Sequence, residues 1–329
     1  MVEKALQSVD KLIILIGSSN NDRRVRNPFT FDERSEMIRI AFDHSVETGR
    51  IVCLALDDYT YQDQLWVRQV HDIVENFITD DIGWTNKFPP IALCGSQKDS
   101  TGYYLKMFPR WDSIPCDHVH PINATDIRED YYENPVRYTQ LDANPDGMDR
   151  DVSLYVNELF RTEDKLRYLI DEYNFSKNYK QQFAASPYPV IHTTTDALVI
   201  QSGYALIVKR GMMPGKGQDA WPGGYLDPYE TIIKGTIREL REETNIDVTT
   251  NYLMANHRTT RVFDDPHRSS RGRVITHASL FILPDGPLPR IKAGDDAKKV
   301  LWKPLSQIKP NTMFEDHGMI LNAMLATGV

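Results

Sequence analysis

The chain has 329 residues, of which 41% are hydrophobic, and a formal net charge of −8. This length allows two domains with separate cores, and the acidic balance excludes a general basic surface for non-specific binding of nucleic acid. No apolar run in the sequence approaches the length of a membrane span. The three cysteines, Cys53, Cys94 and Cys116, have no CxxC spacing, which favours buried thiols in a reducing compartment. We therefore expect a cytoplasmic protein without nucleic-acid or membrane partners.

The first half of the chain alternates apolar runs with amphipathic segments. Three short apolar runs end in polar loops, as buried parallel strands do: residues 11–16, 51–56 and 91–94. Residues 31–42 and 63–78 have helical patterns, and Thr30 with Glu33 predicts a capping box at the first of them. This alternation predicts an α/β fold with a doubly wound parallel sheet, whose ligands bind beyond the carboxyl ends of the strands.

Three segments of this half carry a family resemblance: GSSNNDRRVRNPFTFDER, CGSQKDSTGYYLKMFP and INATDIR. They are similar to the nicotinamide mononucleotide (NMN) adenylyltransferase half of bifunctional adenylyltransferase–Nudix proteins. The resemblance implies a Rossmann-like nucleotidyltransferase domain that joins NMN and ATP into NAD and diphosphate. It also implies a nucleotide site with the following members: Trp66, Lys98, Asp99, Thr125 and Arg128. The alternatives are that Trp66 packs in the core and that Thr125 caps a helix.

The first signature of that family, GxFxPxHxGH, does not occur in this chain. None of the nine histidines has an HxGH spacing, and the opening MVEKALQSVD resembles the helix that follows the signature. In the family, those histidines and the backbone amides beside them hold the ATP phosphates, and such transfer depends on positioning and charge stabilisation of the phosphates. We expect the first strand to be missing, through a truncated start or a vestigial first half. The adenylyltransferase activity is then in doubt, and part of the middle of the sheet should be unpaired.

The boundary between two domains is predicted near residue 185. Residues 151–173 form one amphipathic helical pattern, which completes the first domain, and a PYP sequence soon breaks the helical pattern. The first domain then covers residues 1–185 and the second covers residues 186–329. In the second domain, two strands joined by a hairpin at Ser202-Gly203 precede a glycine-rich loop and a strongly acidic helix.

This acidic helix carries the strongest chemical signal in the sequence. Three carboxylates fall within roughly 100° of one another around the helix: Glu239, Glu242 and Glu243. Apolar side chains gather on a face roughly 130° away: Ile233, Ile237 and Leu240. Like charges on one stripe repel unless a cation neutralises them, and Mg²⁺ or Mn²⁺ prefers carboxylate oxygens. The alternative is a solvated acidic face.

Residues 224–246, GYLDPYETIIKGTIRELREETNI, resemble the Nudix box, Gx₅Ex₇REUxEExGU, in which U is a bulky aliphatic residue. One position departs, because Asn245 replaces the second glycine, and asparagine is the best substitute where a helix ends in a left-handed conformation. The resemblance implies a Nudix α/β/α sandwich that follows the nucleotidyltransferase domain. It assigns metal binding to Glu239, Glu242 and Glu243, and support of the site to Gly224, Glu230 and Arg238.

Two further features concern the substrate. Arg271 and Arg273, with Arg268 nearby, could bind a diphosphate, or they could form a solvated basic loop. The DDA triplet at residues 295–297 and the FEDH sequence at residues 314–317 look like the ADP-ribose-cleaving subgroup of the bifunctional family. Many Nudix enzymes place a mobile carboxylate base in a loop before a helix, which suggests Glu315 as the base beside the catalytic Glu239 and Glu243. The alternative is that Glu315 has only a structural role, next to a helix N-cap.

The resemblance therefore implies a metal-dependent pyrophosphatase that cleaves ADP-ribose to AMP and ribose 5-phosphate, fused to the adenylyltransferase domain. Its expected ligands are ADP-ribose, Mg²⁺ or Mn²⁺ and, for the first domain, ATP and NMN. Two alternatives remain open: hydrolysis of another substrate such as NADH or a diadenosine polyphosphate, and a non-catalytic sensor of ADP-ribose. The oligomeric state and the domain orientation do not follow from the sequence.

Overall fold

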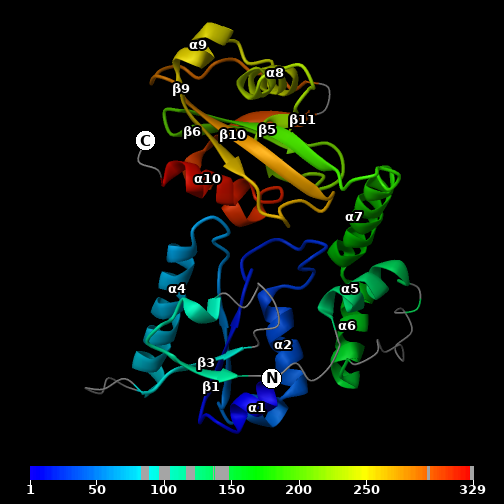
Figure 1. Ribbon diagram of the computed structural model, residues 1–329, viewed down its shortest axis with the longest axis vertical. Coiled ribbons are helices and arrows are strands. Elements are labelled where there is room, and N and C mark those ends of the chain that lie inside the picture. The colour runs from blue at the N-terminus through cyan, green and yellow to red at the C-terminus, as the bar shows by residue number, and fades with distance from the viewer. Residues whose placement is uncertain are drawn as a thin grey trace. The chain divides into compact units, whose positions relative to one another are not determined.

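The structure is a computed structural model that describes residues 1–82, 89–95, 104–115, 123–135, 137, 148–294 and 297–326. The chain divides into two compact units, Met1–Ile170 and Asp171–Val329 (Figure 1). This division falls within helix α7 (Asp164–Gln181), and the domain boundary near residue 185 stays a prediction. Among the described helices, none is both long and apolar enough to cross a membrane.

The N-terminal unit is an α/β fold with four described strands in two parallel pairs. The pairs are β1 (Leu12–Ile16) with β2 (Ile51–Ala55), and β3 (Ala92–Gly95) with β4 (Asp112–Pro115). No strand pairing joins the two pairs within the described residues. The predicted strands at residues 11–16, 51–56 and 91–94 therefore exist, and in the part of the chain that the structure describes they pair only within these two pairs.

Helices surround these strands: α1 (Val2–Leu6), α2 (Phe31–Ala41), α3 (Asp43–Glu47), α4 (Asp63–Phe77), the π-helical turn η1 (Ile78–Ile82), α5 (Ala124–Glu133) and α6 (Arg150–Thr162). The capping box predicted at α2 is confirmed. The Glu33 amide donates to Thr30 Oγ1 over 3.3 Å, and the Thr30 amide donates to the Glu33 carboxylate over 2.8 Å. Two orphan amides at the start of α2 are thereby satisfied. Cys53 forms no disulfide, while Cys116 lies outside the described residues.

The single helix predicted over residues 151–173 is wrong. The structure has two helices instead, α6 and α7, because Glu163 between them has extended backbone, with φ −91° and ψ 106°. No glycine or proline marks this break. The Glu163 carboxylate lies 3.9 Å from Arg23 Nη2, far away in the sequence. A tertiary contact of this kind is invisible to a local helical pattern.

The C-terminal unit is built on a seven-stranded mixed sheet with the order β11-β6-β5-β10-β9, to which β7 and β8 add at β6 and β5. The strands are β5 (Ile191–Gln201), β6 (Tyr204–Arg210), β7 (Asp219–Ala220), β8 (Gly223–Tyr225), β9 (His257–Phe263), β10 (Arg273–Ile282) and β11 (Ala297–Pro304). The helices are α8 (Ile232–Thr244), α9 (Thr250–Ala255), the short 3₁₀ turns η4 (Leu305–Gln307) and η5 (Pro310–Thr312), and α10 (His317–Leu325). Helices α8 and α10 lie on opposite faces of this sheet (Figure 1), which makes the predicted α/β/α sandwich.

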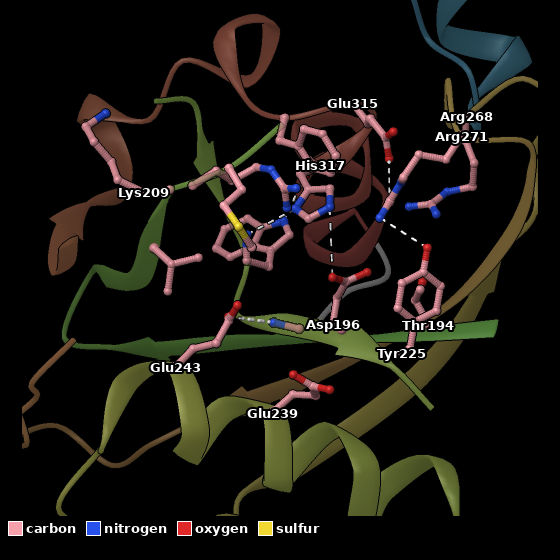
Figure 2. Close-up of a pocket in the computed structure, with 18 of the residues that line it drawn as sticks. Thr194, Asp196, Lys209, Tyr225, Glu239, Glu243, Arg268, Arg271, Glu315 and His317 are labelled. Carbon is pink, nitrogen blue, oxygen red and sulfur yellow. Dashed lines mark hydrogen bonds and ion pairs between the residues drawn. The ribbon is translucent and has the colours of Figure 1, made fainter. Parts of the chain in front are cut away.

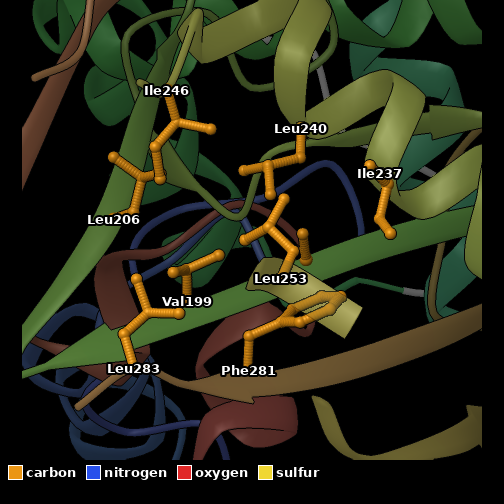
Figure 3. Close-up of a cluster of buried hydrophobic side chains, with 9 residues drawn as sticks. Val199, Leu206, Ile237, Leu240, Ile246, Leu253, Phe281 and Leu283 are labelled. Atoms are coloured by element: carbon orange, nitrogen blue, oxygen red, sulfur yellow. The ribbon is translucent and has the colours of Figure 1, made fainter. Parts of the chain in front are cut away.

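One face of α8 packs into the core of this sandwich, as the apolar pattern predicted. Leu240 is fully buried and Ile237 nearly so, against Val199 and Phe281 from the sheet (Figure 3). Ile233 packs at the edge of the same cluster. The apolar face of α8 is fixed against the sheet. The carboxylates lie on a different face of the helix, so they point away from the core.

Candidate active site

Arg238 organises the acidic face of α8. Its guanidinium donates to both oxygens of Glu230, over 3.1 Å from Nε and 2.6 Å from Nη2. Its Nη1 lies 2.8 Å from the Glu239 carboxylate and 3.0 Å from the Glu242 carboxylate. The bonds to Glu230 raise the pKa of Arg238 above its usual range. A fork of this kind fixes the carboxylates around it, and the supporting role of Arg238 and Glu230 stays a prediction.

Glu239 and Glu243 point into a cavity, whereas Glu242 lies outward. The Glu242 side chain is 59% exposed and the Glu239 side chain 15% exposed. Burial raises the pKa of Glu239, and it raises the pKa of Glu243 to about 8. The Gly223 amide donates to Glu243 Oε2 over 3.0 Å. Two desolvated carboxylates on one helix face therefore share one cavity.

Gly224 is needed for the close approach of Glu239 to strand β8. A Cβ atom at residue 224 would lie 2.6 Å from the Glu239 carboxyl atoms, which is shorter than real Cβ contacts. The end of α8 also matches the prediction, because Asn245 adopts a left-handed conformation with φ 43° and ψ 38°. Its amide donates to Arg241 O over 2.8 Å, and its side chain donates to Lys292 O over 3.1 Å. The asparagine thus supplies the turn that glycine gives in the Nudix box.

The cavity has a volume of about 360 Å³ and lies between α8 and the segments that carry the cations (Figure 2). Glu239 and Glu243 form one side, and Arg268, Arg271, Glu315 and His317 face them from the other side. The lining also includes residues that sequence reasoning missed: Thr194, Asp196, Lys209, Arg210, Trp221, Tyr225 and Phe314. A cavity that sets arginines opposite carboxylates can hold an anionic group together with a cation between them.

The predicted arginines have different positions. Arg271 lines the cavity, while Arg273 is not among the lining residues and lies 3.8 Å from the Asp264 carboxylate. Arg268 lines the cavity too, but it makes a buried two-point ion pair with Asp316, over 2.9 Å and 2.7 Å. Burial alone would lower the pKa of Arg268, but the Asp316 carboxylate raises it above its usual range. Arg271 is therefore the predicted arginine best placed to contact an anion.

Arg210 is a cavity residue without a sequence signal. Its guanidinium carbon lies 3.8 Å from the Phe314 ring centroid, and its Nε donates to Pro214 O over 2.8 Å. Burial lowers the pKa of Arg210. Arg210 ends strand β6, so only the fold brings it opposite α8. Side chains alternate between the two faces of a sheet along a strand, so the sequence could at most have shown which face Arg210 occupies.

Glu315 has a strained backbone and two partners in the cavity. Its φ is 44°, a left-handed value that is uncommon outside glycine. The Ser269 hydroxyl donates to Glu315 Oε1 over 2.7 Å, and Arg271 Nη2 lies 3.6 Å from Oε2. Strain of this kind is kept where the surroundings fix the residue, often at functional sites. The role of Glu315 as the base stays a prediction, with a geometry that supports it.

A buried network lies beneath the cavity. The Trp221 amide donates to His317 Nδ1 over 3.0 Å, so the ring of neutral His317 carries its proton on Nε2. That atom lies 3.9 Å from Asp196 Oδ1, and the Thr276 hydroxyl donates to Asp196 Oδ2 over 2.5 Å. The indole of Trp221 donates to His317 O over 2.9 Å. These contacts tie the start of α10 to strands β5 and β10.

The candidate nucleotide residues of the first unit are only partly described. Trp66 packs edge-on against Phe108, with ring centroids 6.0 Å apart, within an apolar cluster. This contact favours the core interpretation of Trp66. Arg128 Nη2 donates to Thr125 Oγ1 over 3.1 Å, and the cap of α5 is Asn123 rather than Thr125. Lys98 and Asp99 lie outside the described residues, as do Asp295 and Asp296.

The three box glutamates do not converge on one point. In the described part of the chain, no group of three or more His, Cys, Asp or Glu side chains is arranged to hold a metal ion. Glu239 and Glu243 nevertheless fit a hard cation, since both present carboxylate oxygens to the cavity. Arg238 pairs with both Glu239 and Glu242, but the Glu242 side chain is 59% exposed and does not line the cavity. The complete set of metal ligands therefore stays a prediction.

Comparison with known proteins matches both units. A model of the Cytidylyltransferase-like family matches residues 1–130, and a model of the NUDIX domain matches residues 190–324. The crystal structure of a bifunctional NMN adenylyltransferase/ADP ribose pyrophosphatase from Francisella tularensis is 36% identical, with a TM-score of 0.88. The match covers 99% of this chain and 93% of that chain. This chain belongs to the bifunctional NMN adenylyltransferase/ADP-ribose pyrophosphatase family.

Curated relatives of this bifunctional family member match one half each. A nicotinamide/nicotinic acid mononucleotide adenylyltransferase of Acinetobacter baylyi is 34% identical over 41% of this chain and 68% of its own length. An ADP-ribose pyrophosphatase of Methanocaldococcus jannaschii is 31% identical over 39% of this chain and 70% of its own length. The Francisella protein was also solved in complex with AMP and a Mn ion, at 35% identity, a TM-score of 0.86 and the same coverage of 99% and 93%. The predicted family and fold class are thus confirmed.

In this member of the bifunctional family, Asp196 should make stability depend on pH. Burial raises the pKa of Asp196 from 3.8 to about 6. Because the folded state holds the proton more tightly, the stabilisation is complete below the unfolded pKa and is lost as pH rises through the folded pKa. In the wild-type protein the free energy of unfolding should therefore fall between pH 4 and pH 7. We expect Asp196→Asn to make this fall smaller by on the order of 1–3 kcal/mol. Urea unfolding at both pH values measures this effect, with the exposed Asp247→Asn as control. An unchanged pH dependence in Asp196→Asn would contradict it.

Proposed function

We propose that the Nudix domain hydrolyses the diphosphate of ADP-ribose to AMP and ribose 5-phosphate, with Mg²⁺ or Mn²⁺ as cofactor. The observation that carries this proposal is the cavity in which Glu239 and Glu243 face Arg271. Membership of a family that includes a bifunctional NMN adenylyltransferase/ADP ribose pyrophosphatase supports it, as does similarity to a curated ADP-ribose pyrophosphatase. A diphosphate needs both cationic contacts and a metal ion.

Several of the cavity residues then have roles in this reaction. Arg271 and Arg210 bind and orient the diphosphate oxygens. Glu315 accepts a proton at its carboxylate from the attacking water, whose oxygen bonds to phosphorus while the bridging phosphorus–oxygen bond breaks. A divalent ion held by Glu239 and Glu243, with Glu242 as a predicted third ligand, would stabilise charge on the diphosphate and lower the pKa of the water. Trp221 and Phe314, which are both buried, limit the entry of bulk water.

A substrate panel tests this proposal. ADP-ribose, NADH and diadenosine tetraphosphate are each incubated with the full chain and Mg²⁺, and the products are separated by chromatography. The expected result is AMP and ribose 5-phosphate, formed fastest from ADP-ribose and lost when EDTA removes the metal. Faster turnover of NADH or the diadenosine compound would reassign the substrate. Tight binding of ADP-ribose with no turnover would favour the sensor instead.

For the N-terminal unit, we propose the activity of its family, the joining of NMN and ATP into NAD and diphosphate. The Cytidylyltransferase-like match over residues 1–130 supports this proposal, as does the adjacency of Thr125 and Arg128, which can donate to phosphate oxygens. None of the nine histidines in the 329-residue sequence has an HxGH spacing. The test is NAD formation from NMN, ATP and Mg²⁺, with ADP-ribose hydrolysis in the same preparation as the control for folding. Hydrolysis without NAD formation would contradict the second proposal for this chain.

A further inference from the structure

Helix α7 contacts the rim of the Nudix cavity through its last turns. The hydroxyl groups of Ser176 and Ser270 lie 2.9 Å apart, and those of Tyr179 and Tyr225 lie 2.8 Å apart. Ser176 is buried, with 4% of its surface exposed. Ser270 directly precedes Arg271 in the chain, and Tyr225 itself lines the cavity. Two contacts from one helix therefore end beside the groups that face the diphosphate.

Tyr225 joins Tyr179 to Arg271. Arg271 Nη1 donates to the Tyr225 hydroxyl over 3.4 Å, and the guanidinium carbon lies 5.7 Å from the centre of the Tyr225 ring (Figure 2). The backbone of Tyr225 is fixed separately, because Arg238 Nη2 donates to Tyr225 O over 3.1 Å. The Tyr225 side chain is thus the adjustable part of this contact. Its hydroxyl can be directed by the Tyr179 hydroxyl on one side and can direct Arg271 on the other.

Aromatic packing holds Tyr179 in place. Its ring centroid lies 5.3 Å from that of Phe183 and 5.7 Å from that of His192, and His192 packs edge-on against Tyr225 at 5.6 Å. Burial raises the pKa of Tyr179 to about 12, so its hydroxyl keeps the proton at neutral pH. The protonated Tyr179 hydroxyl can therefore donate to or accept from the Tyr225 hydroxyl at the pH at which hydrolysis would be measured.

We propose that Tyr179 is a positioning residue, which holds the Tyr225 hydroxyl and thereby directs the Arg271 guanidinium at the diphosphate. This inference rests on the proposed function only in that the cavity binds a diphosphate. An arginine has many rotamers. A partner that already holds one of them reduces the conformational entropy that the side chain loses when the ligand binds. Tyr179 lies outside the Nudix box and touches neither metal ligands nor substrate in this account. Its effect on the cavity therefore passes through Tyr225, and the hydrogen bond from Arg271 to the Tyr225 hydroxyl carries it to Arg271.

The experiment is a double-mutant cycle in the full chain with Tyr179→Phe, Arg271→Ala and both together. Two quantities are measured: the affinity for inorganic pyrophosphate with Mg²⁺ by calorimetry, and kcat/KM for ADP-ribose. We expect Tyr179→Phe to weaken pyrophosphate binding by about 3- to 10-fold, as the loss of one hydrogen bond would. In the Arg271→Ala background the same change should have no further effect. Tyr173→Phe is the matched control on α7, because it removes a hydroxyl but keeps the ring over which Lys177 lies.

Several outcomes would overturn this inference. Unchanged pyrophosphate affinity in Tyr179→Phe, or a loss of equal size in the Arg271→Ala background, would mean that Tyr179 does not act through Arg271. A wild-type protein that does not bind pyrophosphate would overturn it as well. If the pyrophosphate cycle gives the expected pattern and ADP-ribose is not hydrolysed, only the proposed substrate fails. Ser176→Ala offers a second variant, with a smaller expected loss because Ser270 is tied to Arg271 only through the backbone.

Discussion

Replacing Glu243 with glutamine is expected to lower kcat for ADP-ribose by about 1,000-fold. The Glu243 carboxylate points into the cavity and accepts the Gly223 amide over 3.0 Å. Glutamine keeps the size of the side chain and an oxygen for that amide, so the fold of α8 should persist. It lacks the negative charge that a divalent ion requires, and affinity for Mn²⁺ should fall by a factor of about 10–100. Steady-state kinetics and Mn²⁺ titration measure the two effects.

The control for this change is Glu158→Gln in α6, where the carboxylate is 43% exposed and pairs with Arg161. That variant should keep wild-type hydrolysis, because it removes a carboxylate of the same kind outside the cavity. If Glu243→Gln kept more than a tenth of the wild-type kcat, Glu243 would not be a metal ligand in the rate-limiting step. Retained folding must be shown by unchanged circular dichroism, so that a lower rate reports chemistry.

The box helix could be predicted from sequence because its constraints are local. The period of 3.6 residues places Leu240 in the core and Glu239 and Glu243 on another face, and the structure agrees. The left-handed Asn245 follows from the same local chemistry. Neighbours along the chain fix these features, so no knowledge of the rest of the fold is needed.

The opposite wall of the cavity could not be predicted in the same way. Arg210 ends a strand, and Trp221 and His317 are joined by hydrogen bonds across 96 positions of sequence. Their place in the site depends on which strands pair and on where α10 begins. The position of Arg268 shows the same limit, because its partner Asp316 is 48 residues away. A cluster of arginines in sequence does not show which members are neutralised by distant carboxylates.

The ion pair between Arg268 and Asp316 should be among the most important single contacts for the stability of the C-terminal unit. We expect Asp316→Ala to lower the free energy of unfolding by about 3–5 kcal/mol, because it leaves the Arg268 guanidinium buried without its partner. The two side chains are 2% and 7% exposed, so water cannot replace the lost carboxylate. Urea unfolding followed by intrinsic fluorescence measures the change, and buried Trp221 reports on this unit.

Two comparisons separate burial from ion pairing. The pair of Arg290 and Asp247 has a similar distance of 2.8 Å, but its side chains are 91% and 59% exposed, so Asp247→Ala should cost at most about 1 kcal/mol. The double change Arg268→Met with Asp316→Leu should recover much of the stability, since apolar groups of similar volume often replace buried ion pairs without loss. A cost at Asp316 no larger than at Asp247 would mean that Arg268 is not held by this pair.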